Sequence, residues 1–222
     1  MSRLDHIVYV VDDDPRIREA IDNLLSSYEF RAMLFASAAE FVESAKPDVP
    51  ACLILDIELP DINGLDLQRE LAAGPHPPIV FITGHGDIPS SVRAMKAGAV
   101  DFLSKPFQAD ELIAAVNCAL THDREARAAW SDLSILRERF ASLTPREREV
   151  LPLIVRGLLN KQAAAQLGIS IVTLQIHRSK IMHKMAAGSL ADLVRMSTKL
   201  GISVETGREQ EAEVSGPQHW NK

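Results

Sequence analysis

The chain is poor in cysteine, in aromatic residues and in long apolar runs. Its 222 residues include two cysteines, Cys52 and Cys118, and only 5% of them are aromatic. Two cysteines in apolar stretches of sequence argue against a disulfide framework or a metal knuckle as the basis of the fold, and they favour a reducing compartment such as the cytoplasm. No apolar stretch approaches the roughly 20 residues of a membrane-spanning helix, so no membrane partner is expected. The first six residues also lack a secretory pattern, because a short predicted strand follows them directly.

A net charge of −6 hides a large difference between the two halves of the chain. Residues 1–122 carry 9 Lys and Arg against 19 Asp and Glu, a balance of −10. Residues 138–201 carry 10 Lys and Arg against 4 Asp and Glu, a balance of +6. An acidic half joined to a basic half predicts two domains with different partners and makes the basic one a candidate for binding nucleic acid.

The first half alternates short β-rich runs with helical patterns. Strands are expected at residues 6–11, 31–35, 51–55, 78–83 and 99–104. Helices are expected at residues 15–28, 37–46, 64–73, 88–97 and 108–121. Because the central strands are apolar on both faces, this order predicts a parallel sheet that is covered by helices on both sides.

The second half has only helical patterns. Residues 121–141 contain no Pro or Gly, so the last helix of the first half is expected to continue through them as a linker. The segment Thr144-Pro145-Arg146-Glu147 is a capping box with Pro at the first helical position, and it predicts the start of a new helical unit. Its helices are expected at residues 145–156, 160–167, 171–186 and 190–200. Residues 204–222 are polar and without periodicity, which is typical of a disordered tail.

Polar side chains stand at the ends of four of the predicted strands. Asp12 and Asp13 follow the first strand, Asp56 follows the third, Thr83 ends the fourth and Lys105 follows the fifth. The carboxyl ends of parallel strands form a common crevice in which ligands bind. Three carboxylates, a hydroxyl and an ammonium group in one crevice predict a phosphoryl-acceptor site that works with Mg²⁺.

Each of these groups has an expected role in such a site. Asp13 and Asp56 would bind Mg²⁺ directly and Asp12 through a water, because three carboxylates are costly to bring together without a cation. Asp56 would be the nucleophile and would form an acyl phosphate. Thr83 would hold a phosphoryl oxygen by a hydrogen bond, and Lys105 would do so as a point charge.

A purely structural interpretation competes with this one. A single Asp at the end of a strand is most often a turn or helix-cap residue, and Asp14 before Pro15 fits that role. The structural interpretation leaves the coincidence of charged groups at the ends of separate strands unexplained. The phosphoryl-acceptor interpretation is therefore preferred.

Four segments of the first half match a known family. VVDDDP, LILDIELPDINGLDL, IVFITGHGD and AMKAGAVDFLSKPF closely resemble the receiver domain of bacterial two-component response regulators, over about residues 5–122. The resemblance implies a CheY-like, flavodoxin-like (βα)₅ fold with Asp56 as the phospho-acceptor and a sensor histidine kinase as partner. It also implies Mg²⁺ held by Asp12, Asp13, Asp56 and the backbone carbonyl of Glu58.

The same resemblance implies two further features near the crevice. The peptide bond between Lys105 and Pro106 is expected to be cis. The aromatic switch position of the family falls on Phe102, so Thr83 would move towards the phosphoryl group and the Phe102 ring would turn into the vacated space. Since Phe102 has no hydroxyl, such a switch would be steric.

The basic half carries a second set of motifs. LTPREREVL, Gly157, Asn160-Lys161, LGIS, Thr173-Leu174 and His177 look like a LuxR-type helix-turn-helix of the FixJ/NarL group of regulators, over about residues 140–201. The helix expected at residues 171–186 would enter the major groove of DNA. Two features depart from the family: Gln175 stands where Lys is common, and Pro152 lies inside the first helix, where it removes a backbone donor.

One face of that helix supplies the expected DNA contacts. Gln175 is expected to read adenine, Ile176 to touch a thymine methyl group and Ser179 to bond either partner. The cationic side chains are expected to contact phosphates and set the register. His177 is expected to pack or anchor the helix in preference to reading a base. The expected DNA-contacting residues are Lys161, Thr173, Gln175, Ile176, Arg178, Ser179 and Lys180.

Together these features predict a cytoplasmic response regulator, which is not an enzyme in the usual sense. The expected domains are a receiver domain at 1–122, a helical linker at 123–139 and an all-α helix-turn-helix domain at 140–203. Phosphorylation of Asp56 would favour a homodimer through the surface near helices 88–97 and 108–121 or through the strand between them. The dimer would bind double-stranded promoter DNA. RNA polymerase is a further candidate partner.

Two other functions stay open from the sequence. Asp56-Ile57-Glu58 faintly resembles the nucleophile and acid of Mg²⁺-dependent phosphatases of the haloacid dehalogenase type, although no cap insertion is visible. The chain could also be an interaction module whose basic half binds protein. Turnover of a small phosphate ester would support the first, and salt-sensitive binding to duplex DNA would exclude the second.

Overall fold

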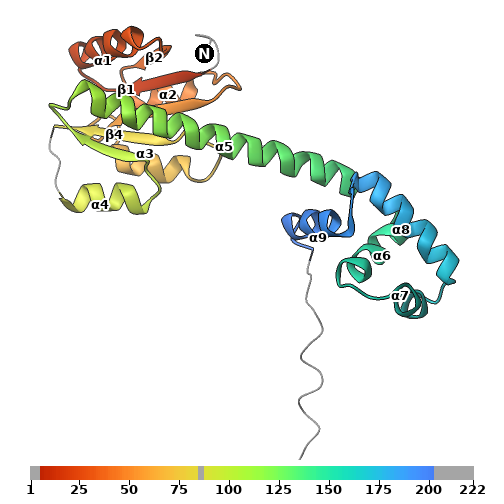
Figure 1. Ribbon diagram of the computed structural model, residues 1–222. Helices are drawn as coiled ribbons and strands as arrows, with labels where there is room; N and C mark the ends of the chain where they lie inside the picture. The colour runs from red at the N-terminus through yellow and green to blue at the C-terminus, as the bar shows by residue number, and fades with distance from the viewer. Residues whose placement is uncertain (1–5, 85–87, 203–222) are drawn as a thin grey trace, which may run out of the picture. The chain divides into compact units, whose positions relative to one another are not determined.

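The computed structural model describes residues 6–84 and 88–202 (Figure 1). The chain divides into two compact units, Met1–Ala129 and Trp130–Lys222. The tail predicted at 204–222 lies outside the described residues. None of the helices within the described ranges is both long and apolar enough to cross a membrane.

The first unit is built on a five-stranded parallel sheet. Its order is β2-β1-β3-β4-β5, which is the doubly wound order of flavodoxin-like folds, and it confirms the predicted fold class. The register pairs Val11 with Leu55 and Thr83 with Ser104, so the carboxyl ends of the strands share one edge of the sheet. The strands are β1 (Ile7–Val11), β2 (Ala32–Phe35), β3 (Ala51–Asp56), β4 (Ile79–Thr83) and β5 (Asp101–Ser104).

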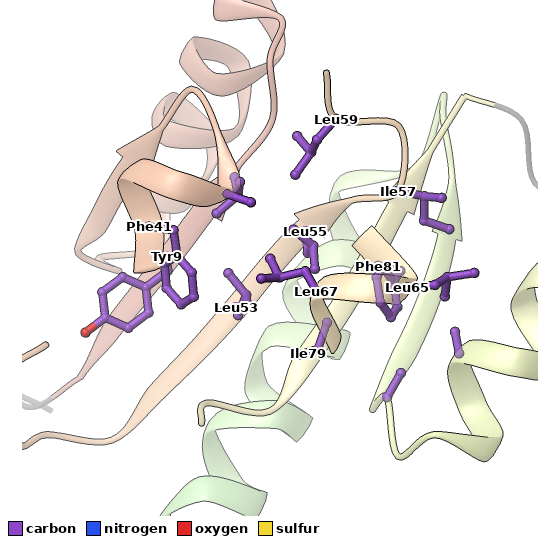
Figure 2. Packing of buried hydrophobic residues seen from close by; sticks show 14 of the residues in the cluster. Tyr9, Phe41, Leu53, Leu55, Ile57, Leu59, Leu65, Leu67, Ile79 and Phe81 are labelled. Carbon is purple, nitrogen blue, oxygen red and sulfur yellow. The ribbon is translucent and has the colours of Figure 1, made fainter. Parts of the chain in front are cut away.

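Helices cover both faces of this sheet, as the doubly apolar strands require. Alternate strand residues point to opposite faces, so Val8 and Val10 pack with α1 (Pro15–Ser27) and with the first part of α5 (Ala109–Ala141). The other face packs against α2 (Ala38–Glu43), α3 (Gly64–Leu71) and α4 (Ile88–Lys96). Figure 2 shows labelled side chains of that second core, namely Tyr9, Phe41, Leu53, Leu55, Ile57, Leu59, Leu65, Leu67, Ile79 and Phe81.

The second helix of the sheet domain ends earlier than predicted, whereas the predicted helical linker is confirmed. The helix predicted at 37–46 ends at Glu43, because the Lys46 ammonium and the Ser44 hydroxyl both donate to the carbonyl of Phe41 at 2.8 Å and satisfy the end of the helix. By contrast, α5 runs without a break to Ala141, so residues 123–139 are helical as predicted for the linker.

The second unit is helical throughout its described part. Its first helix starts at the predicted capping box, in which the Thr144 hydroxyl accepts from Glu147 N at 3.3 Å and the Glu147 carboxylate accepts from Thr144 N at 2.8 Å. Pro152 is accommodated inside that helix, which stays continuous. Leu174, Ile181 and Leu193 are fully buried in the core of this unit. The helices are α6 (Pro145–Val155), α7 (Asn160–Leu167), α8 (Ile171–Met185) and α9 (Leu190–Lys199).

Candidate functional site

The predicted acidic crevice is present at the carboxyl edge of the sheet. Asp12, Asp13 and Asp56 each bring one carboxylate oxygen to within 4.8 Å of the others. Asp12 has no exposed surface and Asp56 is 5% exposed, whereas Asp13 is exposed. The parallel pairing of β1 with β3 causes this proximity, since Asp12 directly follows β1 and Asp56 ends β3. Two buried carboxylates and one at the mouth match the donor set of a divalent cation site that prefers oxygen.

Lys105 reaches into the same crevice from the end of β5. Its Nζ lies 2.6 Å from Asp12 Oδ2 and 2.7 Å from Asp56 Oδ2. The backbone places it there, because Lys105 N donates to the carbonyl of Thr83 at 2.7 Å. The peptide bond between Lys105 and Pro106 is cis, as predicted.

The crevice carries more negative than positive charge. Burial raises the pKa of Asp12, and hydrogen bonds from Lys105 and from Asp14 N only partly oppose that rise. Burial lowers the pKa of Lys105, but its bonds to Asp12 and Asp56 outweigh burial and leave that pKa raised. Three carboxylates thus face one ammonium group. A cation bound there would relieve the remaining charge, so the residues fit Mg²⁺.

Thr83 and Phe102 lie next to the crevice on neighbouring strands. Thr83 is fully buried at the end of β4, which pairs with β3 on the side of Asp56. Phe102 is half-buried on β5 and contacts Phe81, with ring centroids 6.4 Å apart and planes at 46°. The phosphate-binding role of Thr83 and the switch role of Phe102 stay predictions.

The loop that follows Asp56 folds back closely onto it. Glu58 N donates to Asp56 Oδ1 at 3.2 Å, which places the backbone of Glu58 beside the crevice. Gly64 then packs against the strand end, and a Cβ on Gly64 would lie 2.4 Å from the carbonyl oxygen of Asp56. Asn63 caps α3 by accepting from Leu65 N at 2.9 Å. The tight loop requires glycine at position 64, because any side chain would push the Asp56 backbone away.

Arg18 is a neighbour of the crevice that the sequence did not predict. Its Nη1 donates to the backbone carbonyl of Asp12 at 2.6 Å from one turn inside α1. Asp14, as predicted, caps the same helix by accepting from Arg16 N at 2.9 Å. No residue pattern distinguishes Arg18 from other charged positions of the helix, so only the coordinates identify its contact.

In the second unit, α7 and α8 form a helix-turn-helix. Gly168 adopts a left-handed conformation with φ of 64° and makes the turn between them. Ser170 then caps α8 by accepting from Thr173 N at 3.0 Å, and the two hydroxyls lie 2.8 Å apart. Leu174, Ile181 and Met185 form the buried face of α8. The residues predicted to contact DNA that are exposed are Lys161, Gln175, Ile176, Ser179 and Lys180.

Thr173, His177 and Arg178 of α8 are only partly exposed, and two of them were predicted to contact DNA. Thr173 is half-buried, and Arg178 is half-buried with Nη1 3.2 Å from Asn160 Oδ1, which joins α8 to the start of α7. His177 is half-buried with an enclosed Nδ1, as a packing role requires. The phosphate contact predicted for Arg178 therefore has to come from the part of its guanidinium that Asn160 does not use.

Most of the net positive charge of this unit lies in the sequence around the helix-turn-helix. Residues 150–191 contain five Lys and Arg and no Asp or Glu. One of these cations, Lys184, pairs with the buried Glu147 at 2.7 Å and holds α8 against α6. Burial raises the pKa of Glu147, but the hydrogen bond from Lys184 and the capping bonds outweigh burial and leave that pKa lowered. The other four cations have no Asp or Glu within the same stretch of sequence, and this positive balance favours a polyanion as partner.

Comparison with known proteins covers both halves of the chain. The response regulator receiver domain matches residues 8–117, and the luxR family of bacterial regulatory proteins matches residues 141–197. Nodulation protein W of Bradyrhizobium diazoefficiens is 52% identical over 198 residues, which cover 89% of this chain and 87% of that protein. Transcriptional regulatory protein FixJ of Azorhizobium caulinodans is 42% identical over 197 residues, which cover 88% of this chain and 93% of that protein.

A solved structure agrees with these matches. The response regulator StyR superposes with a TM-score of 0.78 at 46% identity, over 88% of this chain and 99% of that one. The two matched regions contain the acidic crevice and the helix-turn-helix, respectively. The chain therefore belongs to the two-component response regulators that join a receiver domain to a LuxR-type DNA-binding domain and regulate transcription.

Proposed function

We propose that Asp56 accepts a phosphoryl group from a sensor histidine kinase and that this modification controls binding to promoter DNA. The observation that carries the proposal is the convergence of three carboxylates within 4.8 Å, with Lys105 Nζ at 2.6 Å and 2.7 Å from two of them. The proposal takes residues 1–122 as the receiver, 123–139 as the linker and 140–203 as the DNA-binding domain. A regulator that binds DNA would act in the cytoplasm, where the chromosome lies.

The proposed reaction transfers a phosphoryl group from a histidine of the kinase to the carboxylate of Asp56. A carboxylate oxygen of Asp56 attacks the phosphorus of a phosphohistidine, so that a P–O bond forms as the P–N bond breaks and the imidazole leaves with the electron pair. The product is an acyl phosphate on Asp56. Lys105 Nζ, which now lies 2.7 Å from Asp56 Oδ2, is placed to follow the charge onto a phosphoryl oxygen. The Thr83 hydroxyl would bond a second phosphoryl oxygen.

Mg²⁺ is the cofactor that the crevice fits. Its ligands would be Asp12, Asp13, Asp56 and the backbone carbonyl of Glu58. When bound, the ion would supply neutralisation of the negative charge shared by the carboxylates and the incoming phosphate. The support for this assignment is the burial of Asp12 and Asp56, whose charge a single ammonium group leaves uncompensated.

Phosphorylation is proposed to act through the surface around α4 and α5. Movement of Thr83 towards the phosphate would let the Phe102 ring turn inward and would shift the adjacent α4. Ile88, Val92 and Met95 of α4 are 79%, 44% and 47% exposed, and their spacing puts them on one side of the helix. An exposed apolar row of this kind supports a homodimer that forms on phosphorylation. Paired helix-turn-helix units would then fit two half-sites of a promoter, with RNA polymerase as a further proposed partner.

DNA contact is proposed for the exposed side of α8 and the start of α7. Gln175, Ile176 and Ser179 would read base edges, with Thr173 beside them. Lys161, Arg178 and Lys180 would contact phosphates. The positive balance of residues 150–191, five Lys and Arg against no Asp or Glu, supports this assignment over binding to a protein partner.

The observed loop argues against turnover of a phosphate ester as the main activity. A hydrolase of the haloacid dehalogenase type needs an acid at residue 58 that faces the crevice and a cap domain over it. Glu58 is exposed, and only seven residues, 57–63, separate β3 from α3. The crevice is therefore proposed to accept one phosphate for signalling, not to work as an enzyme.

Labelling of the full chain by acetyl phosphate with Mg²⁺ tests the proposal. The wild type is expected to take up one phosphate per chain and Asp56→Asn none, with an unchanged circular dichroism spectrum. Asp66→Asn is the matched control, because Asp66 sits on the nearby α3 in a solvent-facing ion pair with Arg69. Labelling that persists in Asp56→Asn would move the acceptor elsewhere, and continued release of phosphate from an ester would favour the hydrolase.

A further inference from the structure

The face of α8 that points away from the core begins with two large apolar side chains. An α-helix advances by about 100° per residue, so Val172 and Ile176 each lie about 160° from the buried Leu174. Val172 is 65% exposed and Ile176 is 50% exposed, while Leu174 is fully buried. Residues four apart on a helix are neighbours, so these two side chains form one apolar ridge on the outer side of α8.

The surroundings of this ridge suit DNA better than a protein partner. The ridge continues into the exposed Ser179, and the exposed Gln175 and Lys180 flank it. No carboxylate occurs anywhere from residue 150 to residue 191. Interfaces with DNA are more polar and much more positively charged than interfaces between proteins. An apolar ridge bordered by amide, hydroxyl and ammonium groups also matches the floor of the major groove. That floor has one apolar group, the 5-methyl group of thymine.

We propose that Val172 is a specificity-determining residue and that it reads a thymine methyl group next to the one read by Ile176. The inference rests on the proposed DNA binding of α8. It adds Val172, which is not among the residues predicted from the sequence to contact DNA. Val172 stands in the first turn of α8, and the N-terminal residues of a recognition helix are the ones that approach base edges.

The spacing of the two side chains sets the spacing of the two thymines. The Cβ atoms of residues four apart on a helix are about 5–6 Å from each other. Successive base pairs rise by about 3.4 Å, so the two methyl groups should belong to base pairs one or two steps apart. Each half-site should therefore carry a pair of closely spaced thymines that the protein recognises through their methyl groups.

Replacement of thymine by deoxyuridine tests this, because it removes only the methyl group. The full chain, phosphorylated by acetyl phosphate, is used to select its tightest site from a pool of random duplexes, and each thymine of that site is then replaced in turn. Wild-type affinity, measured by fluorescence anisotropy, is expected to fall about fourfold at two positions, the loss for one buried methyl group. Val172→Ala should bind the thymine duplex about fourfold more weakly and should lose its sensitivity to deoxyuridine at one of the two positions. Ile176→Ala should lose its sensitivity at the other.

Two further variants separate methyl reading from shape and from general damage. Val172→Thr keeps the branched shape and one of the two methyl groups, so it should lose less affinity than Val172→Ala and keep part of the sensitivity to deoxyuridine. Val42→Ala makes the same change at a 52% exposed position of α2 in the other unit, and it should leave both affinity and uracil sensitivity unchanged.

Three results would overturn the inference. Equal sensitivity of wild type and Val172→Ala to every deoxyuridine would show that Val172 reads no methyl group, and DNA binding by α8 would stand without it. A change in self-association of Val172→Ala in sedimentation, with unchanged DNA affinity, would make the ridge a protein contact. Failure of the wild type to select any duplex would remove the proposed DNA binding and this inference together.

Discussion

At the scale of single residues, burial and hydrogen bonding act in opposite directions on the pKa of Asp12 in the crevice. Burial disfavours its charge, while Lys105 Nζ at 2.6 Å favours it, and burial prevails in raising its pKa. A divalent cation would therefore stabilise the charged form of this carboxylate more than one ammonium group does. The placement of Asp12, Asp13, Asp56 and Lys105 could be predicted because each follows an apolar run that reads as a strand. Their distances could not, since these depend on side-chain conformations that no residue pattern encodes.

Gly64 gives a residue-scale prediction about the loop that carries Asp56. In Gly64→Ala the new Cβ would lie 2.4 Å from the Asp56 carbonyl oxygen and 3.0 Å from Ile57 Cα, so the backbone has to move. We expect a loss of about 1–3 kcal/mol in the free energy of unfolding by urea, together with slower labelling by acetyl phosphate.

Gly74→Ala is the matched control for that prediction. A Cβ at residue 74 meets nothing within 4 Å, so its stability and labelling rate should stay at the wild-type level or rise slightly. If Gly64→Ala kept both properties of the wild type, the close approach of this loop to β3 would not matter for the acceptor.

At the scale of elements, apolar runs and turn signals predicted every strand and helix of the described chain. Helix ends were less predictable, as α2 shows, because Lys46 reaches back to a carbonyl of that helix from outside the helical pattern. Tertiary contacts of charged residues outside the crevice were also beyond prediction. Asp123 reads as one of several charges on a helical linker, yet it is only 6% exposed. Its carboxylate contacts a strand that lies 72 residues earlier in the chain.

Asp123 fastens α5 to the start of the strand that ends in Asp56. Its Oδ2 accepts from Ala51 N at 2.8 Å and from Arg127 Nε at 2.7 Å, and Arg127 also pairs with Asp48. In Asp123→Ala the buried Ala51 N–H would lose its partner, which should cost about 1–3 kcal/mol. Hydrogen exchange should show faster exchange of the Ala51 amide and of the α5 amides around residue 123 than in the wild type.

The control for this element is Asp132→Ala, which removes an exposed carboxylate from the same helix. It should change the free energy of unfolding by less than about 0.5 kcal/mol. Equal effects of the two substitutions would mean that loss of helix charge, and not the contact with β3, accounts for the change.

At the scale of the whole molecule, the charge is divided as the chemistry of the two units requires. The first unit gathers carboxylates in the crevice for which we propose Mg²⁺ and a phosphate, and the second carries the cations for which we propose contacts with DNA. This division was visible in the sequence, since charge totals need no knowledge of the fold. The orientation of each cation was not, and Lys184 illustrates the limit: it belongs to the basic half but is bound to Glu147 inside its own unit.

Salt dependence of DNA binding tests which cations meet the phosphates. Each phosphate contact contributes about 0.9 to the slope of log K against log salt concentration, because contact releases a condensed counterion. Lys180→Ala should therefore lower that slope by about one and weaken binding to all duplexes alike. Val172→Ala should leave the slope unchanged and weaken binding only to duplexes that carry the recognised thymines. Arg31→Ala is the control, because Arg31 is exposed just before β2, at the opposite edge of the sheet from β5, and it should alter neither quantity. A sequence-dependent loss in Lys180→Ala, with an unchanged slope, would instead make Lys180 a reader of bases.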